Sequence, residues 1–73
     1  MMERWDAGDM GCGGLIFELR RRVDALNPGD RLELVARDPG AQSDVPAWCR
    51  MTGHRIVEAN HPVYVIERKA SSR

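Results

Sequence analysis

The spacing of apolar residues changes abruptly between positions 26 and 31, and this change limits the fold more than any other feature. Before it, apolar side chains recur every three or four positions, as they do along one face of an amphipathic helix. These residues are Leu15, Ile16, Leu19, Val23 and Leu26. Pro28 and Gly29 then end the helix, because proline cannot continue it and glycine supplies turn geometry. Residues 31–37 alternate between two faces, which predicts a half-buried strand.

The same two patterns run through the rest of the chain and predict its other elements. Ser43 is a suitable N-cap for a second helix, which tolerates Pro46 in its first turn and ends at Gly53. Alternating or strand-forming segments lie at 3–6, 31–37, 55–59 and 63–68. We expect residues 70–73 to form a frayed polar tail.

These elements predict an α/β fold with the order β-α-β-α-β-β. Two helices on one face of a four-stranded mixed sheet give a two-layer α/β sandwich. The last two strands must be antiparallel, because their connection is so short. A chain of 73 residues is enough for one domain, and we expect it to span 1–73 with an ordered core of about 3–69.

Charge and hydropathy bound the classes of partner. Eleven basic and eleven acidic residues cancel, so no net field draws the chain to nucleic acid or to an anionic membrane. No apolar run approaches the roughly 18 residues of a membrane span, and no signal peptide opens the chain. The sequence therefore predicts a cytoplasmic protein without direct nucleic-acid or membrane contacts.

The two cysteines are predicted to play different roles. Cys12 stands between glycines at the start of the first helix, where backbone N–H groups and the helix dipole favour a reactive thiolate. The alternative is that Cys12 is only a small apolar residue at a turn. Cys49 follows Trp48 in the second helix, which predicts a buried core thiol. No ligand spacing indicates a metal site, and no cofactor motif is present.

Several polar and aromatic residues have two interpretations. Phe17 falls off the apolar stripe of its helix and is either an exposed docking contact or a cover for a hairpin edge. Arg21 and Arg22 belong either to a solvated helix face or to a basic patch that meets an acidic partner. His54 is expected to bond a carbonyl of the preceding helical turn or to interact with the helix dipole, and His61 to be solvated in its turn.

Motifs spread over almost the whole chain, from about Trp5 to Lys69, resemble those of one known family. They are Asp6-Ala7, Cys12, Arg20, Asn27-Pro28-Gly29-Asp30, Asp38-Pro39, Asp44-Val45-Pro46-Ala47-Trp48-Cys49, Gly53-His54, Tyr64 and Arg68-Lys69. In this order and spacing they resemble the TusA-like sulfur carriers, also called SirA- or YhhP-like proteins. The resemblance implies the same β-α-β-α-β-β sandwich that the apolar patterns predict.

The resemblance also implies a function for Cys12. In that family one cysteine accepts sulfur as a persulfide from a donor, such as a cysteine desulfurase or a rhodanese-like protein, and relays it to an acceptor protein. The best-known relay ends in tRNA thiolation. Such a sulfurtransferase needs no cofactor or metal, and a monomer suits the task.

One departure from the family pattern lies beside this cysteine. The family motif is Cys-Pro-x-Pro, whereas the chain has Cys12-Gly13-Gly14-Leu15 and so lacks both prolines. Gly13 restores the amide N–H group that the first proline lacks, and the consecutive amides of Gly13 and Gly14 can form an anion-binding nest that supports a thiolate or persulfide. Asp9 opposes this by favouring the neutral thiol.

Two other functions remain open. The first is a protein-interaction or regulatory module of the same fold without thiol chemistry, which the lost prolines favour. The second is direct RNA binding, by analogy with small sandwiches in translation factors. The neutral charge and the four aromatic residues argue against RNA binding.

Overall fold

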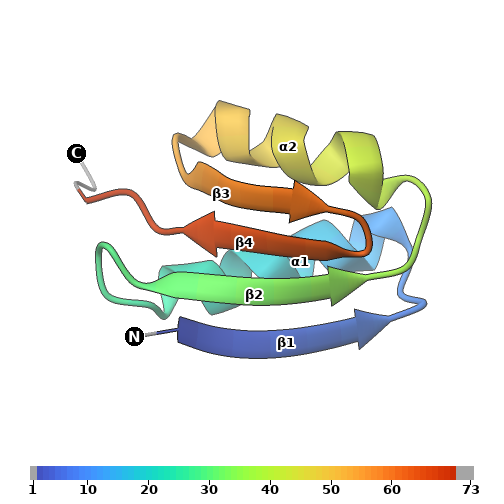
Figure 1. Cartoon of the computed structure of the whole chain (residues 1–73), viewed down its shortest axis with the longest axis horizontal. Coiled ribbons are helices and arrows are strands. Elements are labelled where there is room, and N and C mark those ends of the chain that lie inside the picture. The colour runs from blue at the N-terminus through green and yellow to red at the C-terminus, as the bar shows by residue number, and fades with distance from the viewer. Residues whose placement is uncertain (1, 71–73) are drawn as a thin grey trace.

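The computed structural model describes residues 2–70, apart from the side chain of Cys12. Figure 1 shows the order of the elements, which confirms the predicted β-α-β-α-β-β arrangement. Their bounds are β1 Met2–Gly8, α1 Cys12–Asp24, β2 Arg31–Ala36, α2 Ala41–Thr52, β3 Arg55–Asn60 and β4 Val63–Glu67. The tail predicted at 70–73 falls largely outside the described residues, since only Ala70 belongs to them.

The four strands form one mixed sheet with the order β1-β2-β4-β3. The β1 and β2 strands are parallel because α1 connects them, and Trp5 pairs with Leu34 in their register. The other two pairings, β2 with β4 and β3 with β4, are antiparallel, as predicted for the final hairpin. The sheet and its two helices therefore make the predicted two-layer α/β sandwich.

One core joins the two layers. Leu19 and Val23 of α1 and Val45 of α2 have no exposed surface and pack with Leu34 of β2 and Ile66 of β4. These side chains come from both helices and from one face of the strands, because alternate strand residues point to the same side. Burial of this face fixes α1 and α2 against the sheet (Figure 1).

The start of the second helix differs from the prediction. The helix begins at Ala41 with Gly40 as its N-cap, so the assignment of Ser43 as N-cap was wrong. Ser43 lies in the first turn, where its hydroxyl donates to the Gly40 carbonyl oxygen at 3.3 Å. Pro46 consequently lies inside the helix rather than in its first turn. The helix ends as predicted, with Gly53 in the left-handed conformation at φ 89°.

Two other details differ from the prediction. The first strand is longer than residues 3–6, because its pairing with β2 continues to Gly8 opposite Ala36. His61 is half-buried rather than solvated, since its Nδ1 atom hydrogen-bonds the hydroxyl of Tyr64. Within residues 2–70, neither helix is long and apolar enough to cross a membrane.

Candidate functional site

The end of β1 and the loop that follows it lead the chain to the start of α1. Gly8 takes a left-handed conformation at φ 62°, which glycine adopts without steric cost, and its amide donates to Oδ1 of Asp6 at 2.9 Å. The amide of Met10 then donates to the Ala7 carbonyl at 3.2 Å. These bonds shape the loop so that Cys12 is the first residue of α1.

The first turn of α1 has no side-chain cap. Its N-cap residue, Gly11, has no side chain to accept a hydrogen bond, and no acidic residue occupies the first turn. The first helical bond runs from the Leu15 amide to the Gly11 carbonyl at 2.8 Å. The backbone N–H groups before Leu15 therefore give this helix end a partial positive charge that no capping side chain offsets. The reactivity of the Cys12 thiol stays a prediction, because its side chain lies outside the described part of the chain.

The two glycines after Cys12 leave the helix start open. A Cβ atom built on Gly13 would meet nothing within 4 Å, and one on Gly14 would lie 3.7 Å from Cγ of Met10. Leu15, where the family pattern has its second proline, is instead a fully buried core residue. The second proline position of the motif is therefore occupied by a core side chain, Leu15, and the first by an exposed glycine, Gly13. Whether Gly13 and Gly14 support a persulfide stays a prediction.

An open groove begins at Gly13 and separates α1 from α2. Its volume is about 530 Å³, and it is lined by Gly13, Ile16, Phe17, Arg20, Trp48, Met51 and Thr52. Phe17 and Met51 are 69% and 78% exposed, and together they place apolar surface along the groove. Phe17 lines the groove beside α2, so its position agrees with the docking interpretation, although the docking role itself stays a prediction.

Two residues of this groove were missed in the sequence interpretation. Arg20 was named among the family motifs but not as a residue of a groove, and Met51 was not considered. Both follow helical spacing from residues already singled out, because Arg20 stands three positions after Phe17 and Met51 three after Trp48. That spacing was the available signal for a shared face.

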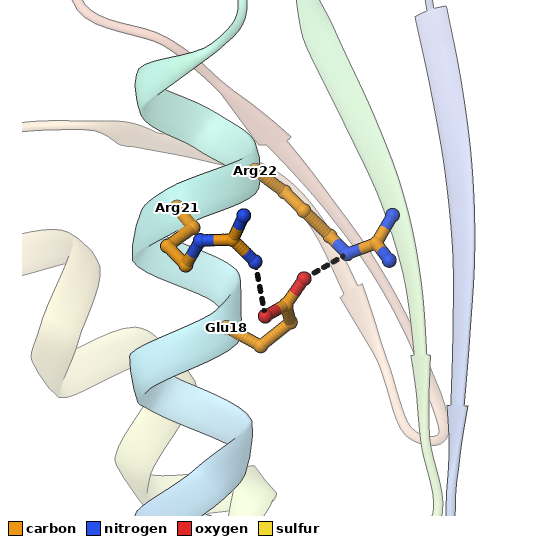
Figure 2. Close-up of polar contacts among 3 residues, drawn as sticks. All are labelled: Glu18, Arg21 and Arg22. Carbon is orange, nitrogen blue, oxygen red and sulfur yellow. Dashed lines mark hydrogen bonds and ion pairs between the residues drawn. The ribbon is translucent and has the colours of Figure 1, made fainter.

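Arg21 and Arg22 lie on another side of α1. Figure 2 shows both guanidinium groups reaching the carboxylate of Glu18, with donor–acceptor distances of 2.8 Å from Arg21 and 3.0 Å from Arg22. The hydrogen bond from Arg21 is the largest cause that holds the pKa of Glu18 below its usual value. Arg22 also lies 4.6 Å from the ring centre of Trp5. Their docking role stays a prediction, and the structure places them away from the groove that holds Gly13 and Phe17.

Cys49 is a core thiol, as predicted. Its residue surface is only 3% exposed, and it forms no disulfide. Burial raises the pKa of this thiol to about 11, so it is neutral near pH 7. Cys49 is therefore both shielded and protonated.

Among the side chains that the structure describes, no three His, Cys, Asp or Glu residues gather closely enough to hold a metal ion.

His54 supports the far end of α2 in a way that the sequence did not predict. It is 8% exposed, and its Nδ1 atom accepts the backbone N–H of Lys69 at 3.1 Å. Of the two predicted roles, the bond to a last-turn carbonyl was wrong, because Nζ of Lys69 binds the Thr52 carbonyl instead, at 2.8 Å. The interaction with the helix dipole stays a prediction. Burial is the largest cause that lowers the pKa of His54, so the neutral ring is favoured.

Comparison with known proteins shows the family. The model of the family described as "Sulfurtransferase TusA" matches residues 3–68. The sulfur carrier protein TusA of Pseudomonas paraeruginosa is 35% identical over 69 residues, which cover 89% of this chain and 87% of the relative. The protein of the same name from Pseudomonas putida strain W619 is 32% identical over 69 residues, which cover 89% of this chain and 86% of that relative. The chain therefore belongs to the TusA family of sulfur carriers.

Proposed function

We propose that this sulfur carrier accepts sulfur as a persulfide on Cys12 and relays it to a partner protein, acting as a sulfurtransferase. The observation that carries the proposal is the contrast between the two cysteines. Cys49 is enclosed in the core with its pKa raised to about 11, which disfavours both thiolate formation and access to a partner. Cys12 is the first residue of α1, where a helix end favours the thiolate.

The relay consists of two exchange reactions. The Cys12 thiolate attacks the terminal sulfur of a donor persulfide, so that a sulfur–sulfur bond forms at Cys12 while the donor's own sulfur–sulfur bond breaks. The electron pair of the broken bond leaves with the donor thiolate. An acceptor thiolate then attacks the terminal sulfur on Cys12, and the Cys12 thiolate is regenerated. Neither step changes the number of electrons, so the relay needs no cofactor, metal or outside oxidant.

The surface beside Cys12 is proposed to meet the partners. A partner must bring its sulfur atom to Cys12, so it also covers the groove that starts at Gly13 and exposes Phe17. Arg21 and Arg22, which are paired with Glu18, would be peripheral contacts on the neighbouring face. We propose a cysteine desulfurase or a rhodanese-like protein as donor, an acceptor protein that leads to tRNA thiolation or related sulfur traffic, and a cytoplasmic monomer of one domain.

The test is intact-mass analysis after incubation with a cysteine desulfurase and cysteine. We expect the unmodified chain to gain one sulfur atom that a reductant removes, and the Cys12→Ser variant to gain none. The matched control is Cys49→Ala, which removes the other thiol without burying a hydroxyl group and should still be loaded.

Two results would contradict the proposal. A gain that persists in Cys12→Ser and disappears in Cys49→Ala would assign the sulfur to the wrong cysteine. No gain with either a desulfurase or a rhodanese donor would favour the alternative of an interaction module without thiol chemistry.

A further inference from the structure

The end of α2 is held by a small set of contacts, which we call the α2 clasp and define as His54, Lys69 and the Thr52 carbonyl. The backbone N–H of Lys69 donates to Nδ1 of His54 at 3.1 Å, and its Nζ donates to the Thr52 carbonyl at 2.8 Å. The Lys69 side chain crosses Gly53 closely, since a Cβ atom there would lie 3.5 Å from Cδ of Lys69. One residue that follows β4 therefore fastens both the last turn of α2 and the residue after its cap.

The clasp directly supports one wall of the groove. Thr52 lines the groove, and so does Trp48, whose ring centre lies 5.3 Å from that of His54. Thr52 is further tied to Trp48, because its hydroxyl donates to the Trp48 carbonyl at 2.8 Å. The position of this wall thus depends on His54 and Lys69.

Arg68, the residue before Lys69, binds the end of α1, the helix that forms the opposite wall of the groove. Nη1 of Arg68 donates to the Asp24 carbonyl at 2.8 Å and also to the Leu26 carbonyl, at the end of α1. The backbone of Arg68 is itself held, because its amide donates to the Asp30 carbonyl at 2.9 Å. Residues 68 and 69 therefore connect the carboxyl ends of both helices that border the groove.

We propose that His54 and Lys69 are positioning residues of the partner groove, and that protonation of His54 opens the clasp and weakens docking of the sulfur donor. The inference rests on the proposed function, because it takes the groove as the donor's docking surface. His54 and Lys69 act on the donor only through the wall that they hold in place.

The chemistry of the imidazole gives the clasp its proton sensitivity. Nδ1 accepts the hydrogen bond of the Lys69 amide only while it keeps its lone pair. In the protonated ring Nδ1 carries a hydrogen, so two N–H groups would face each other and the bond would be lost. The cations of Lys69 and Arg68 also oppose a charge on His54, whereas the carboxylate of Asp24 favours it, and Trp48 on α2 is uncharged. Burial and these cations lower the pKa of His54, so the clasp should open as pH falls below the ordinary histidine value of about 6.5.

The first experiment follows the clasp without any sulfur chemistry. Trp48 fluorescence is recorded against pH in a Trp5→Phe background, which leaves one tryptophan. We expect a transition with a midpoint below about 6.5. His54→Asn should abolish it, because the Asn oxygen can accept the Lys69 amide but does not titrate. Lys69→Met should move the midpoint upward, because it removes a cation that opposes protonation.

The matched control is Arg50→Met, which removes an exposed cation from the last turn of α2 outside the clasp. It should leave the midpoint unchanged. A transition that survives in His54→Asn, or one that Arg50→Met moves as far as Lys69→Met does, would overturn the clasp. Far-UV circular dichroism of each variant separates an altered clasp from a chain that fails to fold.

The second experiment tests docking with a cysteine desulfurase as the probe. The carrier concentration for half-maximal loading is compared between the unmodified chain and His54→Asn at each pH, so that the donor's own pH dependence cancels. We expect the unmodified chain to need about two- to tenfold more carrier at low pH, the equivalent of one lost hydrogen bond. A ratio that does not vary with pH would overturn the link between clasp and docking. Absence of loading at every pH would refute the proposed function, while the fluorescence transition would still report the clasp.

Discussion

Substitution of glycine by alanine should raise the free energy of unfolding at some positions of this chain and lower it at another, according to the backbone conformation of each glycine. Gly13 and Gly14 occupy the first turn of α1, whereas Gly53 ends α2 with φ 89°. Alanine in a helix is favoured over glycine by about 0.5–1 kcal/mol, mainly because glycine loses more backbone entropy on folding. Alanine in the left-handed conformation instead costs about 1–2 kcal/mol. The same chemical change should therefore stabilise one pair of sites and destabilise the other site.

The surroundings of each site support these magnitudes. A Cβ atom on Gly13 meets nothing within 4 Å, and one on Gly14 makes ordinary contact with Met10 at 3.7 Å, so neither adds strain. The double variant Gly13→Ala/Gly14→Ala should then gain about 1–2 kcal/mol in free energy of unfolding. For a domain of this size each kcal/mol raises Tm by about 4–8 °C. Gly53→Ala should lower Tm, since its Cβ also approaches the Lys69 side chain at 3.5 Å.

Urea denaturation and calorimetry of the three proteins measure both quantities. The double variant should unfold at higher urea concentration with an unchanged dependence on urea, and Gly53→Ala at lower concentration. A double variant that is no more stable than the unmodified chain would refute the helical start of α1 at Cys12. A Gly53→Ala variant of unchanged stability would refute the left-handed cap.

One further substitution tests the helix start beside Cys12, and one reagent tests the burial of Cys49. Leu15→Pro, which restores the second proline of the family motif, should lower the free energy of unfolding by about 3 kcal/mol or more, because the Leu15 amide bonds the Gly11 carbonyl; a urea midpoint equal to that of the unmodified chain would contradict this. Iodoacetamide should react rapidly with no more than one thiol of the folded chain, because Cys49 is buried and its pKa is raised to about 11, and with both thiols in urea. Mass spectra that show two rapid additions to the folded chain would contradict the burial of Cys49.

The order of elements could be predicted because helix and strand periods differ plainly along this chain. The stripe that ends at Leu26 and the alternation that starts at Arg31 each match one element, and the core uses the same side chains. The start of α2 was misassigned because Ser43 is a common N-cap residue, while the true N-cap is Gly40, three positions earlier. Local preference could not separate the two, since both residue types are accepted at an N-cap.

The candidate site was less readable, because its parts come from distant positions. Phe17 and Trp48 both line the groove although they stand 31 positions apart in the sequence. The packing of the two helices brings them together, and no local pattern predicts it. His54 binds Lys69, fifteen positions later, so its partner could not be read from the turn around it. Arg21 and Arg22 are different, because Glu18 stands three and four positions before them and the pairing follows from helical spacing alone.

Peptide mapping of the loaded protein tests the central claim most directly. The chain is loaded by a cysteine desulfurase, separated from the donor, alkylated and digested with trypsin. Cleavage after Arg4 and Arg20 gives a peptide that contains only Cys12, and cleavage after Arg37 and Arg50 gives one that contains only Cys49. We predict one additional sulfur atom on peptide 5–20, lost when an acceptor thiol is added before alkylation. The additional sulfur on peptide 38–50, or on neither, would contradict a relay through Cys12.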